Sequence, residues 1–268
     1  MRLTRGIAVL SVAAVAVLGL TACSSDDTGA DRTSADQTST APEAEEAAEV
    51  SDLLTVDDFA RRVAQAASEA GSYSMVMTTT VSGMTTTTTA DVRYLGDTQE
   101  MQMVTEVGGL GTADVRFIDG MFYMSMGETT ENKFVVIDPA DTTGPFAGAF
   151  DGMVDQLDPA ASVKALDGAL VSVEPTGDPV ELDGVQAQQY TVVVDTTRLQ
   201  GALAEQAEAA GSALPAQITY QYWIGPDDLM RKMVMDMSGS TVEMVTSNWG
   251  GDVEIVAPTA DQITDMTF

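Results

Sequence analysis

The chain of 268 residues has no histidine and only one cysteine, Cys23. The lack of histidine excludes Ser-His-Asp and Cys-His catalysis, and it removes the commonest ligand of zinc and copper and the usual acid–base group near neutral pH. A lone cysteine cannot form an internal disulfide. The sequence also lacks a phosphate-binding loop, because Gly108–Gly111 is followed by neither a helix nor a lysine. We therefore expect a protein that is not an enzyme and needs no cofactor or metal.

Basic residues are also scarce, with 12 Lys and Arg against 41 Asp and Glu and a net charge of −29. Such a surface repels nucleic acids and anionic headgroups. A nucleic-acid partner is therefore excluded, and so is attachment to a membrane through a basic patch. Scattered carboxylates leave a calcium site or a hydrolase that uses acids alone as minor alternatives. The adjacent pairs Asp57/Asp58 and Asp227/Asp228 are explained more simply by a helix start and a turn.

The first 22 residues have the pattern of an export signal. Arg2 and Arg5 precede an uncharged run over 7–20, and Leu20-Thr21-Ala22-Cys23 resembles a bacterial lipobox. The sequence thus predicts a lipoprotein signal peptide over 1–22 and lipid attachment at Cys23, which would hold the protein on the outer face of the cytoplasmic membrane. An ordinary signal peptide with a chance cysteine, or an uncleaved anchor, is the alternative.

Residues 23–54 have the composition of a disordered, acidic tether, since they contain nine Asp and Glu, one arginine and no aromatic residue. Residues 55–268 then suit a single domain. Thr55 is the expected N-cap of a helix that ends at Gly71, and further helical segments are expected over 142–167 and 197–210. Two insertions of helix into a run of strands favour the α+β class.

About ten strands, mostly antiparallel, are expected in this domain. Asp119-Gly120 is a strong hairpin signal, and Asp183-Gly184 directly precedes a further expected strand. The period-two segments are Tyr73–Val81, Thr85–Leu95, Gln99–Val107, Ala113–Ile118, Met121–Met126, Phe134–Ile137, Ala169–Glu174, Val185–Asp195, Ala216–Ile224, Met230–Met237, Thr241–Trp249 and Val253–Val256.

Methionine is the informative residue, with 16 in the chain. Several lie two apart within one strand and so point to the same face of the sheet. Methionine is unbranched and polarizable, which suits a surface that adapts to varied apolar partners. The sequence predicts an apolar cavity lined by Met75, Met77, Met101, Met103, Phe122, Met124, Met126, Tyr190, Val192, Val194, Tyr222, Met233, Met235 and Met237. The alternative is a solid, methionine-rich core.

Three local patterns resemble the mycobacterial LppX/LprA/LprF/LprG lipoprotein family. They are Ala113–Tyr123, Asp183-Gly184-Val185 followed by Tyr190-Thr191-Val192, and Tyr222-Trp223-Ile224 followed by Leu229–Lys232. The resemblance implies a curved antiparallel half-barrel with helices packed over its concave face, similar to the LolA and LolB carriers. It also implies a cavity for the acyl chains of lipids or lipoglycans, and it supplies no catalytic residues.

Together these features predict a membrane-anchored envelope lipoprotein that binds or carries a lipid or glycolipid. The competing hypothesis is a non-enzymatic surface scaffold or sensor with a solid core. A cavity larger than about 300 Å³ would favour the first hypothesis.

Overall fold

The computed structural model describes one compact unit of the chain, within residues 48–268. The predicted signal peptide, Cys23 and nearly all of the predicted tether lie outside the described residues. Leu54, at the end of that tether, is 3% exposed and belongs to the folded unit. The described residues are 53–96, 98–107, 111–141, 159–166, 168–201, 203–204, 215–237 and 239–264.

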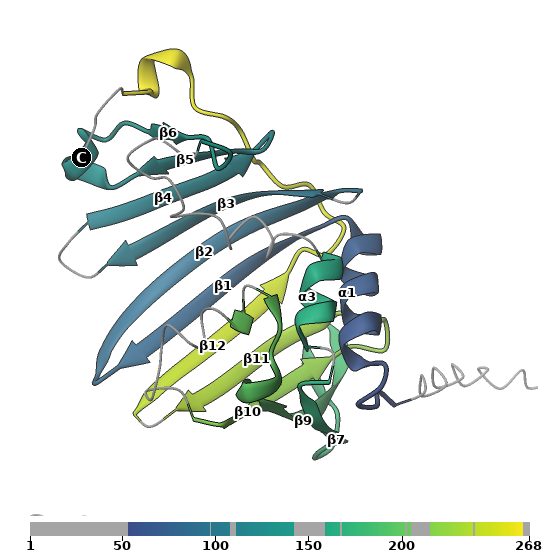
Figure 1. The fold of residues 1–268 in the computed structure, drawn as a ribbon. Helices are drawn as coiled ribbons and strands as arrows, with labels where there is room; N and C mark the ends of the chain where they lie inside the picture. The colour runs from purple at the N-terminus through teal and green to yellow at the C-terminus, as the bar shows by residue number, and fades with distance from the viewer. Residues whose placement is uncertain are drawn as a thin grey trace, which may run out of the picture. The chain divides into compact units, whose positions relative to one another are not determined.

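Twelve strands form a single, entirely antiparallel sheet in the order β6-β5-β4-β3-β2-β1-β12-β11-β10-β9-β7, with β8 paired to β9 (Figure 1). The sheet is open, with β6 at one end and β7 at the other, and the first strand pairs with the last at its middle. The strands are β1 (Ser72–Val81), β2 (Met84–Leu95), β3 (Thr98–Val107), β4 (Gly111–Ile118), β5 (Met121–Ser125), β6 (Val135–Ile137), β7 (Leu170–Pro175), β8 (Val180–Leu182), β9 (Val185–Asp195), β10 (Gln217–Ile224), β11 (Met230–Met237) and β12 (Ser240–Ser247).

The predicted hairpin turn at Asp119-Gly120 is confirmed, and Asp183-Gly184 forms a second turn of the same kind. Asp119 and Gly120 have φ of 51° and 77° between β4 and β5, and Asp183 and Gly184 have φ of 53° and 73° between β8 and β9. Positive φ at both central residues is the requirement of a type I′ turn, whose twist matches that of the flanking strands. The aspartate–glycine sequence therefore sets these two connections.

Three details of the strand prediction are wrong. Val253–Val256 forms no strand: its local alternation of valine and acid finds no strand partner, and the Val256 carbonyl accepts a hydrogen bond from Arg116 instead (Nη1–O 2.7 Å). β5 ends at Ser125, because Met126 turns (φ −111°, ψ 39°) into the 3₁₀ helix η1 (Gly127–Thr130). The short β8 was not predicted.

The helices α1 (Phe59–Ala70) and α3 (Pro159–Leu166) accompany the sheet, and they lie side by side (Figure 1). α1 begins after the predicted N-cap. Thr55–Asp58 is a turn before the helix, in which the Asp58 carboxylate accepts a hydrogen bond from the Thr55 backbone amide (N–Oδ1 2.7 Å). The predicted end is confirmed, since Gly71 caps the helix in the left-handed conformation with φ 81°. Within the described ranges, no helix is both long and apolar enough to cross a membrane.

Gly71→Ala is expected to lower the free energy of unfolding by about 1 kcal/mol, because alanine disfavours positive φ. Nothing lies within 4 Å of a Cβ built at this position, so the cost is one of backbone strain and not of collision. Urea unfolding of residues 48–268 measures it. Glu69→Ala, at an exposed helical position, is the control and should shift stability by less than about 0.5 kcal/mol.

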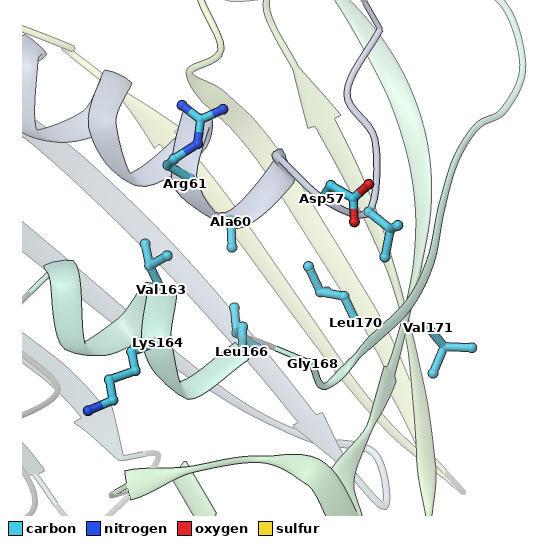
Figure 2. Close-up of a pocket in the computed structure, with 10 residues that line it drawn as sticks. Asp57, Ala60, Arg61, Val163, Lys164, Leu166, Gly168, Leu170 and Val171 are labelled. Carbon is cyan, nitrogen blue, oxygen red and sulfur yellow. The ribbon is translucent and has the colours of Figure 1, made fainter.

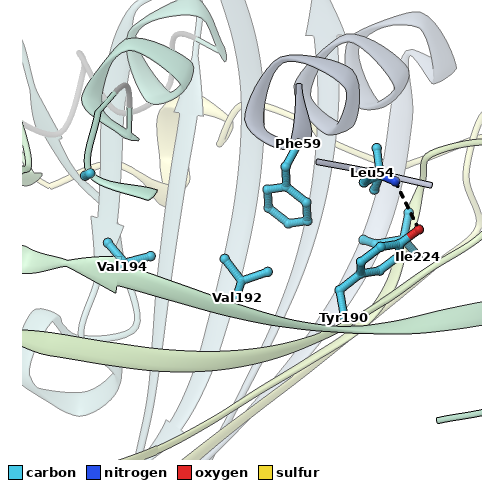
Figure 3. Close-up of a cluster of buried hydrophobic side chains, with 7 residues drawn as sticks. Leu54, Phe59, Tyr190, Val192, Val194 and Ile224 are labelled. Carbon is cyan, nitrogen blue, oxygen red and sulfur yellow. Dashed lines mark hydrogen bonds between the residues drawn. The ribbon is translucent and has the colours of Figure 1, made fainter. Parts of the chain in front are cut away.

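Eleven of the buried apolar residues form two separate clusters toward the two ends of the sheet. The α1 cluster packs Phe59 and Leu54 against β9 and β10, and the Leu54 amide donates to the Tyr190 hydroxyl (3.3 Å; Figure 3). Its members are Leu54, Phe59, Ala169, Tyr190, Val192, Val194 and Ile224. The β5 cluster contains Phe117, Phe122, Val135 and Ile137. Between these clusters lie the central strands β3, β2, β1, β12 and β11.

Candidate functional site

The strand register places the predicted methionine pairs on one face of the sheet. Directly opposed residues of antiparallel strands point to the same side. Met77 opposes Met244, and Met244 in turn opposes Met233 of the next strand. On the other side of β1, Met75 opposes Ala90, which opposes Met103. Four strands of the central sheet are thereby joined through their methionines on a common surface.

The same ladder extends to both ends of the sheet. Met103 opposes Val115, which opposes Met124, and Met233 opposes Tyr222, which opposes Tyr190. All of the predicted residues except Met126 share this surface, which we call the methionine face. Met126 lies beyond the end of β5 and is 46% exposed. The face carries Met75, Met77, Met101, Met103, Phe122, Met124, Tyr190, Val192, Val194, Tyr222, Met233, Met235, Met237 and, unpredicted, Met244.

Exposure varies along the methionine face in a regular way. At its ends, Phe122, Tyr190, Val192 and Val194 are buried within the two clusters. Between them every methionine of the face remains partly exposed, neither fully buried nor fully open to solvent. A closed core of this width would bury these side chains completely. In the part of the chain that the structure describes, this face is therefore a broad apolar surface that is only partly buried.

The opposite face of the central strands is polar. Arg93 forms an ion pair with Glu100, Arg116 with Asp114 (2.8 Å) and Lys232 with Glu243 (2.8 Å), and the register puts all three pairs on the side away from the methionines. Lys232 also lies over the Trp223 ring, 5.5 Å from its centroid. The central sheet is thus amphipathic, with charge on one face and thioethers on the other.

A pocket of about 650 Å³ lies where α1 and α3 meet β7 (Figure 2). Ala60, Val163, Leu166 and Leu170 point toward its interior, whereas the charged ends of Arg61 and Lys164 extend outward. None of the predicted cavity residues lines this pocket, so their role as a cavity lining stays a prediction. The lining residues are Val56, Asp57, Ala60, Arg61, Val163, Lys164, Leu166, Gly168, Leu170 and Val171.

Ionic contacts fix α1 above the sheet. Arg62 donates from Nε and Nη2 to both carboxylate oxygens of Asp228 in the β10–β11 turn (2.9 and 2.7 Å), and its Nη1 lies 3.6 Å from Asp58. The hydrogen bond to Asp228 raises the pKa of Arg62. Asp227 pairs with Arg231 (2.6 Å). These contacts occupy Asp58, Asp227 and Asp228, three of the four acids considered above as catalytic pairs.

Two tyrosines of β10, Tyr220 and Tyr222, are uncharged at neutral pH. Burial raises the pKa of Tyr222, with a smaller contribution from Tyr220, and burial also raises the pKa of Tyr220. Phe59 meets Tyr222 edge to face, with 5.2 Å between ring centroids. Within the part of the chain that the structure describes, no three Cys, His, Asp or Glu side chains gather as metal ligands. The surroundings of the face therefore suit an apolar ligand.

These observations define an α+β protein built on an open antiparallel sheet with helices on one face. No protein-family model matches the chain, and no curated protein sequence matches it significantly. Solved structures that are similar include LprF from Mycobacterium bovis (14% identity, 76% of this chain, 97% of that chain, TM-score 0.49) and the lipoprotein LppX from Mycobacterium tuberculosis (12%, 75%, 98%, 0.49). MucB is also similar, with 13% identity over 79% of this chain and 62% of that chain and a TM-score of 0.40.

LprF and LppX bear two of the names in the family that the sequence patterns resemble. At such low identity the similarity concerns the arrangement of strands. Family membership accordingly stays an interpretation of the sequence, and ligand and location are matters for proposal.

Proposed function

We propose that this chain is a lipid-anchored protein of the cell envelope that holds the acyl chains of a lipid against its methionine face. One observation carries the proposal: methionines from five strands, β5, β3, β1, β12 and β11, together with Val115 of β4 and Ala90 of β2, form a continuous apolar surface whose methionines remain partly exposed. An apolar surface of this extent ordinarily marks a binding site.

Methionine supports a lipid ligand in particular. Its unbranched side chain has three rotatable bonds, so a row of methionines can adjust to chains of different length and branching. The polar opposite face keeps the sheet soluble while the methionine face is occupied. Holding a lipid requires only that its acyl chains are buried against an apolar surface, and we propose no catalytic step.

The lipid anchor supports the same role from the N-terminal side. Acylation of Cys23 would keep the domain near a membrane, and residues 23–54 would allow it to move relative to that membrane. A protein placed in this way meets its ligand at high local concentration.

Residues 48–268 purified without detergent are expected to carry lipid that survives native mass spectrometry and is recovered by organic extraction. A parallel sample, delipidated and refolded, should bind a fluorescent fatty acid and release it to unlabelled competitor. Protein that is free of lipid and fails to bind the probe would contradict the proposal. That result would favour the scaffold or sensor with a solid core.

A further inference from the structure

The hairpin of β1 and β2 carries no charge over most of its length. Residues 70–90 contain no Asp, Glu, Lys or Arg, and this is the longest such run in a chain of which 20% is charged. The run includes all of β1 and the first part of β2, and the structure describes every residue in it. In a protein of net charge −29 this hairpin is a local exception.

The turn of this hairpin exposes an apolar pair. Ser82 and Gly83 have φ of 51° and 82°, as a type I′ turn requires, so the turn follows the twist of its strands. Val81 and Met84 flank it as a directly opposed pair and are 44% and 73% exposed. The Ser82 amide donates to the Gly239 carbonyl of the neighbouring β11–β12 connection (3.5 Å). We call residues 81–84 the β1–β2 tip.

The tip lies on the same side of the sheet as the methionine face. Val81 follows Met77 by four residues on β1, and residues an even number apart in a strand share a side. Across the sheet Val81 opposes Ser240, which opposes Met237. The last row of side chains at this end of the sheet is therefore Met84, Val81, Ser240 and Met237, which are apolar or uncharged.

Acids of nearby strands at this end belong to the opposite face. Glu106 of β3 opposes Thr87, and Asp236 of β11 opposes Thr241, both of which alternate with residues of the methionine face. The tip is also remote from α1, because β1 extends about 30 Å from the end of that helix (Figure 1). Exposed charges are screened beyond about 8 Å at physiological ionic strength, so the acids around α1 act little on the tip.

We propose that the β1–β2 tip contacts the surface of the lipid bilayer, with Val81 and Met84 entering the boundary between headgroups and acyl chains. The inference goes beyond the proposed function, since a domain can touch a bilayer whether or not it holds a lipid. Such contact would set the methionine face upright on the membrane, with its lowest row at the lipid.

A bilayer fits this surface better than a second protein does. A stable protein interface buries about 800 Å² on each partner, far more than two side chains supply. Entry into the bilayer boundary requires apolar area without charge and no complementary shape. The acidic remainder of the surface is repelled by anionic headgroups, whereas the uncharged hairpin can approach them.

Met84→Trp in the full chain reports this contact, because bromine atoms on lipid acyl chains quench an indole that reaches them. The protein, extracted from expressing cells, is placed in phosphatidylcholine vesicles with ordinary or brominated chains, and the emission of the parent chain is subtracted. Burial of the exposed parts of the two tip side chains favours contact by roughly tenfold, so most of the added emission is expected to be quenched. Leu95→Trp is the matched control: Leu95 is 50% exposed at the other end of β2, and its indole should stay unquenched.

Val81→Asp combined with Met84→Trp should reduce quenching to the level of Leu95→Trp, because a carboxylate loses its hydration on entering the boundary. Val180→Asp combined with Met84→Trp is the control for the added charge. Val180 is 46% exposed on β8, away from the tip, and its replacement should leave quenching unchanged. Circular dichroism of all variants establishes that each is folded.

Equal quenching of Met84→Trp and Leu95→Trp, or quenching that survives Val81→Asp, would overturn the inference. Unquenched emission accompanied by oligomers that Val81→Asp disperses would mean that a second copy of the chain occupies the tip instead. Lipid recovered from a protein whose tip is not quenched would leave the proposed function intact, so the two proposals fail separately.

Discussion

Cys23→Ser is expected to abolish incorporation of palmitate into the protein. Serine lacks the thiolate that acts as the nucleophile, and the chain has no second cysteine to replace it. Cells expressing the full chain are grown with a clickable palmitate analogue, and the immunoprecipitated protein is examined for label. Ser24→Ala, which preserves the thiol and changes the adjacent residue, is the control and should label as the parent chain does.

Palmitate that remains on the Cys23→Ser protein would contradict attachment at this position. A parent chain without label would favour the alternatives of an ordinary signal peptide or an uncleaved anchor. The mass of the N-terminal peptide separates these two, because only an uncleaved chain retains residues 1–22. The lipid anchor is therefore testable independently of anything bound to the methionine face.

The methionine face could be predicted from spacing alone, without knowledge of which strands are neighbours. Residues two apart in any strand share a side, so Met75 with Met77 and Met101 with Met103 each had to act as a pair. Burial then forces the apolar side of every strand to the same face of the sheet, which the register confirms. Met244 was missed because Val242 and Thr246 flank it at that spacing and give no methionine signal.

The pocket could not be predicted in this way, because its lining comes from separate segments that only the tertiary structure brings together. Arg61 follows from a helical pattern and Lys164 from another, but no local rule places α1 beside α3. The contact between Arg62 and Asp228 likewise joins positions 166 residues apart. Such contacts depend on packing over the whole sheet, which the spacing of residues within one segment does not predict.

Phe122→Ala is expected to lower the free energy of unfolding by about 3–5 kcal/mol, the usual cost of removing a buried phenyl ring. Phe122 is 0% exposed, its ring centroid lies 4.7 Å from that of Phe117, and it packs within the β5 cluster. Urea unfolding of residues 48–268 measures the loss. Phe122→Leu, which retains most of the apolar volume, should cost clearly less.

Met103→Ala provides the decisive comparison when both variants are measured in delipidated protein, since Met103 lies on the same face but is partly exposed. Its removal is expected to cost about 1 kcal/mol, because only part of its apolar area is withdrawn from water on folding. A loss as large as that of Phe122→Ala would mean that the methionines are packed as a solid core, as the scaffold hypothesis requires. Bound lipid should reverse the pattern: a ligand lying against Met103 makes that side chain part of a buried contact. Met103→Ala would then reduce the stabilisation that lipid provides more than it reduces the stability of the lipid-free protein.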